Sequence, residues 1–343
     1  MRWTADKANE WSDKTGWLCG FNYVPSTAVN SSEMWQNEFY DGETIKRELA
    51  IAVQIGFNSC RVFLQYLVWE AERDIFLETF GDFCGIAKSN GITVMPVLFD
   101  DCAFSGREPY LGEQEPPVPG VHNSGWTPSP GPRIADDPSK EEGLREYVKT
   151  IIGAHKKDGR ITAWDLYNEP GNNNRGEKCL PLVNKAFAWA REISPVQPLT
   201  AGVWSYAGYD LTFADMSDVV SYHDYALPGT NADGFDPAES SEKTIETLKK
   251  HGRPLLCTEW LHRPLGNRFE THLPLFKKEN VGSFHWGLIT GKTQTNLCWE
   301  TMNGNPDPSP AVWQHDLFYP DGRPYRGDEV LFIKRIFGKP GGK

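Results

Sequence analysis

Eight short, continuous apolar runs constrain the fold of this chain more than any other feature. Each run has the length of a strand, and none alternates apolar with polar residues, which is typical of parallel strands covered on both faces. The runs are residues 17–23, 59–64, 93–99, 161–167, 199–204, 219–223, 255–258 and 283–288. Between runs, residues 44–55 and 182–193 repeat apolar side chains at helical intervals and are predicted to be helices.

Repeated strand–helix units in one chain predict an α/β protein, a (β/α)8 TIM barrel. Periodicity alone also allows an open doubly wound sheet, but no glycine-rich turn of the dinucleotide-binding type supports that alternative. Barrels of this size commonly form one domain, so residues 1–343 are expected to be a single domain. Asp328 is expected to cap a last helix whose Leu331, Phe332 and Ile336 pack onto the barrel.

One long irregular segment, residues 103–138, follows the third predicted strand. It contains eight prolines and no periodicity of its own. Loops of this length are usually functional or disordered, and loops after barrel strands rise on the face that carries active sites. Residues 122–126 in its middle offer side chains suited to sugars, which makes Trp126 a candidate substrate contact. A solvated flap is the alternative.

Two glutamates stand where apolar runs end. Glu169 follows the fourth run, within an Asn-Glu-Pro sequence, and Glu259 follows the seventh. In a closed eight-stranded ring these strand ends can face each other across the mouth. Cleavage of a glycosidic bond needs one carboxyl that holds a proton and one carboxylate that faces the anomeric carbon. A salt bridge explains either glutamate alone, whereas the pair predicts a glycoside hydrolase.

Charge and composition exclude several other classes. The net charge is −11, without a Lys/Arg cluster, so no nucleic-acid partner is expected. No apolar stretch is long enough to span a membrane, and no signal peptide is visible at the N-terminus. The seven cysteines show no paired spacing, so we expect reduced thiols and a cytoplasmic protein. His223, His262 and His285 lack metal-ligand spacing, and no metal or other cofactor is expected.

The segments around both glutamates resemble glycoside hydrolase clan A, and within it the cellulase-like family 5, over nearly the whole chain. The resemblance implies a retaining barrel enzyme in which Glu169 is the general acid/base and Glu259 the nucleophile. A nucleophile of this kind needs a low pKa and the acid a raised one. The two carboxyl groups are then expected about 5–5.5 Å apart, and not the roughly 6.5–9.5 Å of inverting enzymes.

Five further residues match positions of that family. The resemblance implies that Arg61 keeps the nucleophile anionic and that Asn168 bonds the 2-hydroxyl of the sugar being cleaved. His223 and Tyr225 match a His-x-Tyr sequence whose tyrosine orients the nucleophile. Trp286 matches the floor of the central subsite. Their structural alternatives are an ion pair within the core, a bonded strand-end histidine and simple packing.

The chain departs from the family near the end of the third strand. Many members carry a histidine there, whereas this chain has Asp100 and Asp101. The two carboxylates could bind a sugar diol, or they could cap the long loop through backbone N–H groups. The departure leaves the clan intact and bears on the family's usual substrates.

The combined features predict an exo-acting β-glycosidase for short oligosaccharides, with β-mannosidase first and β-glucosidase or β-xylosidase as close alternatives. The runner-up is an endo-acting glucanase, xylanase or mannanase with an open cleft. A barrel that binds carbohydrate without catalysis is a further alternative, although both carboxylates are present. The sequence leaves the sugar, the linkage and the oligomeric state open.

Overall fold

The computed structural model describes residues 1–206, 208–225 and 235–338. Its centre is one parallel sheet with the strand order β5-β4-β3-β2-β1-β8-β7-β6. All eight predicted strands are therefore present, in the order expected of a barrel. They are β1 (Cys19–Asn22), β2 (Ser59–Phe63), β3 (Thr93–Asp100), β4 (Trp164–Asn168), β5 (Leu199–Thr200), β6 (Val220–His223), β7 (Leu255–Glu259) and β8 (Gly282–Trp286).

The sheet closes between β5 and β6, although β5 itself is only two residues long. Val203, just beyond β5, forms a parallel bridge with Tyr222 of β6. Its backbone N–H donates to the carbonyl of Ser221 at 3.0 Å, and its carbonyl accepts from the N–H of His223 at 2.8 Å. These bonds complete the ring, and the predicted (β/α)8 barrel is confirmed.

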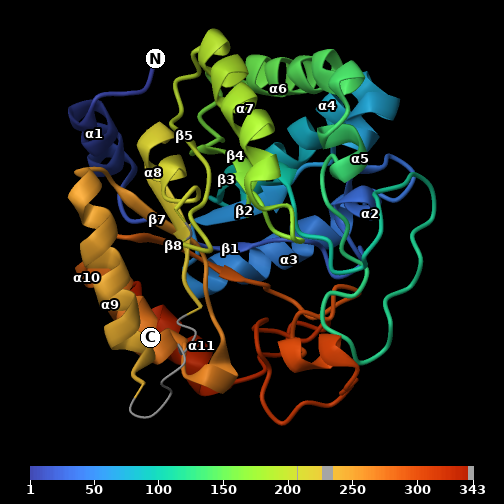
Figure 1. Ribbon diagram of the computed structural model, residues 1–343. Coiled ribbons are helices and arrows are strands. Elements are labelled where there is room, and N and C mark those ends of the chain that lie inside the picture. The colour runs from blue at the N-terminus through green and yellow to red at the C-terminus, as the bar shows by residue number, and fades with distance from the viewer. Residues whose placement is uncertain (207, 226–234, 339–343) are drawn as a thin grey trace.

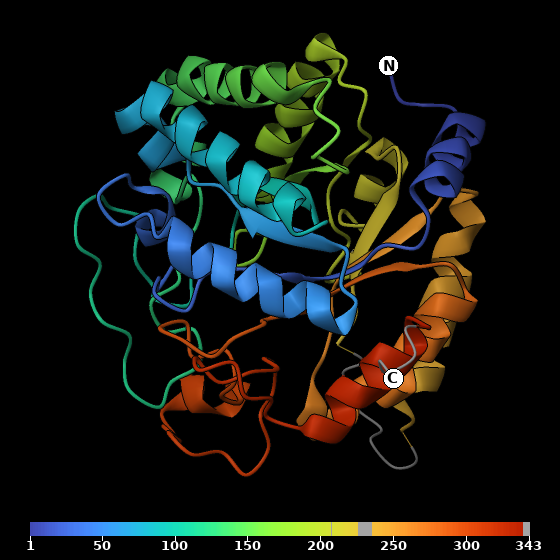
Figure 2. The same cartoon turned by 180° about the vertical axis from the view of Figure 1, so that it is seen from behind.

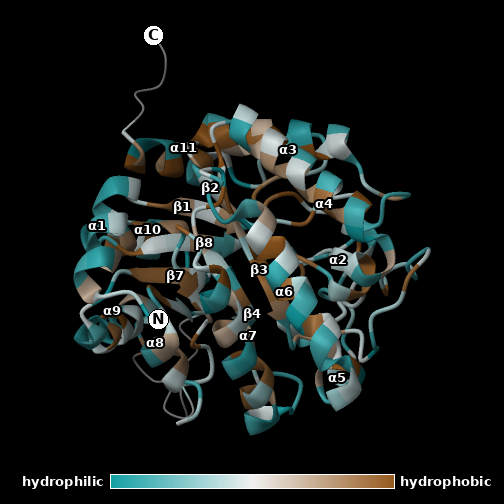
Figure 3. Ribbon diagram, turned by 90° about the horizontal axis from the view of Figure 1, so that it is seen from above, coloured by the Kyte–Doolittle hydropathy of each residue, from teal (hydrophilic) through white to brown (hydrophobic). Residues whose placement is uncertain are grey.

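Helices surround the strands and cover them from solvent (Figures 1 and 2). Viewed from above, the strands lie inside the ring of helices and are largely apolar (Figure 3). The helices are α1 (Ala5–Thr15), α2 (Ser31–Trp35), α3 (Gly42–Ile55), α4 (Tyr66–Ser89), α5 (Pro132–Ala135), α6 (Glu141–His155), α7 (Leu180–Ile193), α8 (Thr212–Met216), α9 (Pro237–Leu248), α10 (Phe269–Lys278) and α11 (Gly327–Ile336). Among the described residues, no helix combines the length and the apolar character needed to cross a membrane.

Helix α1 closes the end of the barrel at which the strands begin. Its buried Ala8 packs, with Trp11 and the preceding Trp3, against an apolar layer inside the barrel. That layer consists of Leu18, Met95, Ala163, Val219, Leu256 and Phe284. The end beneath α1 is thus sealed by hydrocarbon, and the opposite end carries the long loops (Figure 1).

The helix predictions hold for α3 and α7, and the details of α11 differ. The cap of α11 is Arg326, and Asp328 lies in its first turn, where it pairs with the Arg326 side chain at 2.7 Å. Leu331 is 59% exposed, while the buried apolar residues of α11 are Val330 and Ile333. Four consecutive apolar residues, 330–333, leave the phase of the helix undefined in the sequence. The prediction that Leu331 packs onto the barrel was therefore wrong.

Candidate active site

Both glutamates lie at the open end of the barrel, and both are buried. Glu259 is the last residue of β7, and Glu169 directly follows β4. Glu169 adopts a left-handed backbone conformation with φ 40°, which is strained for a residue with a Cβ atom. A carboxylate oxygen of each glutamate and the Nδ1 atom of His223 lie within 4.8 Å of one another. The two carboxyl groups are thus close together, as the expected separation of about 5–5.5 Å requires.

Glu259 is held by two hydrogen-bond donors. The Arg61 guanidinium donates to Oε1 at 3.0 Å, and the Tyr225 hydroxyl donates to Oε2 at 2.9 Å. Arg61 is fully buried and also pairs with Asp165 at 2.8 Å and donates to Asn22 at 2.7 Å. A buried cation needs this degree of pairing, because each unsatisfied charge in the interior is costly. The network fixes the Glu259 carboxylate in one orientation.

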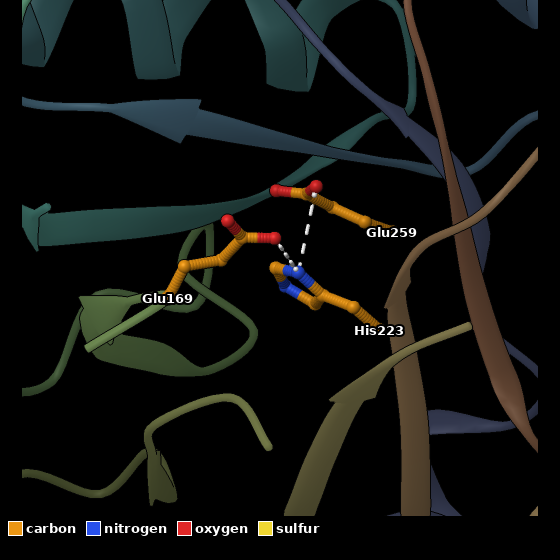
Figure 4. A group of neighbouring side chains, drawn as sticks. All are labelled: Glu169, His223 and Glu259. Atoms are coloured by element: carbon orange, nitrogen blue, oxygen red, sulfur yellow. Dashed lines mark hydrogen bonds and ion pairs between the residues drawn. The ribbon is translucent and has the colours of Figure 1, made fainter. Parts of the chain in front are cut away.

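Glu169 has a different set of partners. His223 Nδ1 lies 2.8 Å from its Oε1 atom and 3.5 Å from Oε2 of Glu259, so the imidazole lies between the two carboxyls (Figure 4). The second oxygen of Glu169 accepts from the Asn172 amide and from the Cys102 thiol, the latter at 3.1 Å. Both oxygens are therefore oriented, each by a different part of the chain.

Burial acts to raise the pKa of both carboxyls, and their neighbours separate the two values. The hydrogen bond and charge of His223 outweigh burial at Glu169 and lower its pKa. At Glu259 the charge of Glu169 adds to burial, and the pKa is raised although His223 and Arg61 oppose the change. The pKa of His223 is raised because both carboxylates outweigh its burial.

This order is the reverse of the expected one, in which the acid has the raised pKa and the nucleophile the low one. The physical reason is position, since His223 lies closer to Glu169 than to Glu259. In such a coupled group the protons belong to the set and not to one residue. His223 Nδ1, which hydrogen-bonds Glu169 and lies close to Glu259, is therefore the third member of the group that shares these protons.

The side chains of the adjacent Asp100 and Asp101 form hydrogen bonds to other residues of the chain. Asp100 accepts from the Asn168 amide at 2.8 Å, from the Trp126 indole at 2.7 Å and from the Cys102 backbone at 2.9 Å. Burial raises the pKa of Asp100 to about 7. These three side-chain hydrogen bonds go to residues that line the cavity, whereas Asp100 is not among the lining residues.

Asp101 points to the turn that follows Glu169. It accepts from the Tyr167 hydroxyl and the Gly171 backbone, each at 2.8 Å, and pairs with Arg175 at 2.9 Å. The contact of Asp100 and Asp101 with a sugar diol stays a prediction. Of the two interpretations of the sequence, hydrogen bonding to the chain is the one that the structure shows.

The carboxyls open into a cavity of about 650 Å³. Trp286 lies in its wall, 9% exposed, and packs edge-to-face against Phe63 and Trp126. Trp126 is itself only 1% exposed, so little of its ring is open to the cavity and its main role is to pack against Trp286. Among the expected residues, those that line the cavity are Trp126, Asn168, Glu169, His223, Tyr225, Glu259 and Trp286. Further lining residues include Cys102, His122, Asn123, Asn172, Trp204, Trp299 and His315. Arg61 lies below the cavity and acts through Glu259 and Asn168.

The long loop, residues 103–138, is joined to the segment that follows β8. The Asn123 N–H donates to the carbonyl of Thr293 at 2.9 Å, and the carbonyl of Gly120 accepts from Asp307 at 2.9 Å. The Gln294 side chain forms three more bonds, with Val118, Gly120 and Val121. The two segments lie side by side at the open end in both views (Figures 1 and 2). They form one continuous wall of the cavity, so this loop is not a free flap.

Several site residues were not predicted from the sequence. Asn22 and Asp165 stand inside strands, where a polar residue is a signal that could have been used. Cys102 and Asn172 carry no such signal, because they reach Glu169 only through the fold. Within residues 1–206, 208–225 and 235–338, one group has the donor spacing of a metal site, namely Glu169, His223 and Glu259. Their hydrogen bonds to each other and to Arg61 account for that closeness.

Comparison with known proteins gives a family match. Residues 20–287 match the sequence model of a family described as cellulase, glycosyl hydrolase family 5. No curated protein matches the sequence significantly.

Solved structures resemble the chain in fold at low identity. A GH5_18 protein of Streptomyces cattleya in complex with GlcNAc is 14% identical, with a TM-score of 0.64 over 95% of this chain and 82% of that one. An exo-β-1,4-mannosidase of Opitutaceae bacterium strain TAV5 is 15% identical, with a TM-score of 0.61 over 94% and 59%. A β-1,4-mannanase of the sea hare Aplysia kurodai is 16% identical, with a TM-score of 0.55 over 79% and 87%.

Proposed function

The chain belongs to glycosyl hydrolase family 5, and from that premise we propose that it is an exo-acting β-mannosidase that works by double displacement. Membership of the family makes it a retaining O-glycosyl hydrolase. The proposal adds the roles of individual residues, the mode of attack and the sugar.

Glu259 is the nucleophile and Glu169 the general acid/base. In the first step a Glu259 oxygen forms a bond to the anomeric carbon as the glycosidic C–O bond breaks, and Glu169 protonates the departing oxygen. In the second step Glu169, now a carboxylate, takes a proton from water as the water oxygen attacks the same carbon and Glu259 leaves. Two inversions at one carbon retain its configuration. Arg61 and Tyr225 stabilise Glu259 as an anion before attack and as the leaving carboxylate afterwards.

His223 supplies the proton that Glu169 delivers. The proton crosses the 2.8 Å hydrogen bond from Nδ1 to Oε1, a transfer that leaves the net charge of the site unchanged. Glu169, now a neutral acid, then donates this proton to the departing glycosidic oxygen. A bound sugar also excludes water, which disfavours charge on Glu169 and promotes this transfer.

The wall made by the long loop and the segment after β8 is the observation that supports exo action. It is tied together by backbone bonds at Asn123 and Gly120 and by the Gln294 side chain, so it blocks extension of a polysaccharide on that side. An endo-acting enzyme needs subsites on both sides of the carboxyls, which requires this loop to fold away. The cavity volume, about 650 Å³, is of a size for a short oligosaccharide.

Mannose is proposed as the sugar on weaker support. Two of the structures that resemble this fold are named as enzymes of β-1,4-mannosides, one exo-acting and one a mannanase. Fold similarity at this identity does not distinguish exo from endo action. The proposal of exo action therefore rests on the wall formed by the long loop and the segment after β8.

The test is hydrolysis of p-nitrophenyl β-mannoside, β-glucoside, β-xyloside and β-galactoside, measured beside soluble mannan, xylan and glucan. We expect rapid release from the mannoside and no shortening of the polymers. Release from a different glycoside would replace mannose and keep exo action. Cleavage within polymers, with silent aryl glycosides, would overturn the exo proposal. The anomeric configuration of the first-formed product, followed by NMR, should be that of the substrate.

A further inference from the structure

Cys102 lies at the centre of the acid/base site, although nothing in the proposed reaction uses it. It stands two residues beyond β3, it is 5% exposed, and it lines the cavity. Its backbone N–H donates to Oδ1 of Asp100 at 2.9 Å, which fixes the turn that directs the thiol inward.

The direction of the thiol hydrogen follows from its neighbours. The Asn168 and Asn172 amides donate to the sulfur, at 3.5 and 3.4 Å. In both of these bonds the sulfur is the acceptor, and the S–H group remains to donate. Its partner is Oε2 of Glu169 at 3.1 Å. A carboxylate oxygen accepts and does not compete for the donor role.

The thiol stays protonated in this setting. Burial raises its pKa well above the usual value, and the nearby charges of Asp100, Glu169 and Glu259 act in the same direction. Cys102 is thereby a donor at every pH at which the enzyme works, and its side chain adds no titration of its own.

We propose that Cys102 is a positioning residue for the acid/base, whose S–H group holds Oε2 of Glu169 while His223 holds Oε1. The inference rests on the proposed role of Glu169. A thiol is a weak donor, so it orients the carboxyl without stabilising the anion as strongly as a hydroxyl would. Glu169 must alternate between acid and carboxylate in each turnover, and a weak donor suits that exchange.

The proposal predicts opposite effects for two substitutions. Loss of a donor to the ionised carboxylate destabilises that form, so Cys102→Ala should move the basic limb of the pH profile to higher pH. Cys102→Ser places a stronger donor there and should move the limb to lower pH. The other groups that face Glu169 are the Asn172 amide, which also donates to Oε2, and the titratable His223, Glu259 and Asp100. All four are unchanged in both variants. Each shift should be about half a pH unit to one unit.

The experiment measures kcat/KM for a phenyl glycoside of the preferred sugar, from about pH 4 to pH 9, because its leaving group needs protonation. Cys84→Ala, a buried cysteine of α4 outside the cavity, is the matched control and should keep the wild-type profile. Thermal unfolding of each variant verifies that it is folded at the assay temperature. If both Cys102 variants keep the wild-type basic limb, or shift it in the same direction, the inference is overturned.

Glu169→Ala separates this failure from failure of the proposed function. That variant should lose nearly all activity toward the phenyl glycoside and retain more toward a dinitrophenyl glycoside, whose leaving group needs no proton. If Glu169→Ala retains wild-type activity toward both, the acid/base assignment fails and the role of Cys102 fails with it. If Glu169→Ala behaves as expected while the Cys102 profiles coincide with wild type, only the inference about Cys102 is lost.

Discussion

The two ends of this barrel differ in the side chains that fill them, which are apolar at one end and charged at the other. Beneath α1 the interior is a layer of apolar side chains such as Met95 and Phe284. At the open end the interior is a set of buried ions, with Arg61 between Asp165 and Glu259. Strands β4 and β7 serve both layers: Ala163 directly precedes β4, which contains Asp165, and β7 contains both Leu256 and Glu259. Because the two layers share these strands, the apolar layer can stabilise the strands while the charged layer determines the chemistry.

The difference matters for how each end tolerates change. An apolar side chain truncated beneath α1 leaves a cavity, whose cost is local and roughly proportional to its volume. A charge removed at the open end leaves its partner buried and unpaired, which affects every group bonded to that partner. The bottom of the barrel should therefore respond to substitution in stability alone, and the top in stability and catalysis together.

Glu259→Ala gives the largest expected effect on catalysis. Turnover should fall by at least about 10⁴-fold, because the nucleophile is removed. The fold should persist, since Arg61 keeps its pair with Asp165. Steady-state kinetics and far-UV circular dichroism measure the two properties. Added azide should restore part of the activity and give a product of inverted configuration; substantial activity without azide would identify another nucleophile.

Arg61→Met should lower both the stability of the fold and the catalytic activity. It leaves Asp165 and Glu259 buried without their cation, at a cost of about 3–5 kcal/mol of unfolding free energy. Activity should fall as well, because Glu259 then gains a proton more readily. Denaturant unfolding measures the change in unfolding free energy, and kcat measured on the same preparation gives the loss of activity. The double variant Arg61→Met/Asp165→Asn should recover part of the stability and none of the activity, and an undiminished loss of stability would contradict the charge argument.

Phe284→Ala should damage stability alone. It removes a fully buried ring from the layer beneath α1, at a cost of about 3–5 kcal/mol. At a temperature where the variant stays folded, kcat should remain within about threefold of wild type, since the ring packs in the apolar layer and does not line the cavity. Thermal unfolding measures the loss of stability, and kcat at a temperature where the variant is folded measures the effect on catalysis. A large loss of kcat in the folded variant would show that the two ends are coupled.

The sequence predicted most of what depends on periodicity and strand ends. Eight apolar runs predicted eight strands, and the glutamates that end two of these runs predicted that the ends of β4 and β7 face each other across the mouth of the barrel. Arg61 and Tyr225 came with the family resemblance, and the structure brings both to Glu259. These features are local in sequence or repeat along it, which is why they can be read before folding.

Other features depend on distances that no local pattern encodes. Asp100 and Asp101 look equivalent in sequence, yet neighbouring residues of a strand face opposite sides, so one supports Asn168 and the other Arg175. Cys102 reaches Glu169 across 67 positions of the chain. The protonation order of the two glutamates depends on His223 lying 2.8 Å from one and 3.5 Å from the other. Such differences are set by packing and appear only in the folded chain.

His223→Asn tests the protonation order of the two glutamates. Of the four variants in this comparison of the barrel ends, it should change activity and stability least. In the wild type, activity on the basic side is lost as His223 and Glu169 give up the proton they share. Because the pKa of His223 is raised by the two carboxylates, this loss is expected at a higher pH than for an ordinary histidine. In the variant Glu169 must hold the proton alone, and as a carboxyl it releases it at lower pH even though it is no longer next to a cation.

The basic limb of kcat/KM should therefore move down by about one pH unit or more, while the acidic limb, which reports ionisation of Glu259, should move up because a neighbouring positive charge is gone. The profile narrows from both sides, and its maximum falls. Stability at the end beneath α1 should not change, since His223 is not part of that layer. A basic limb that stays in place would mean that Glu169 holds its own proton in the wild type, and it would restore the order that the sequence first predicted.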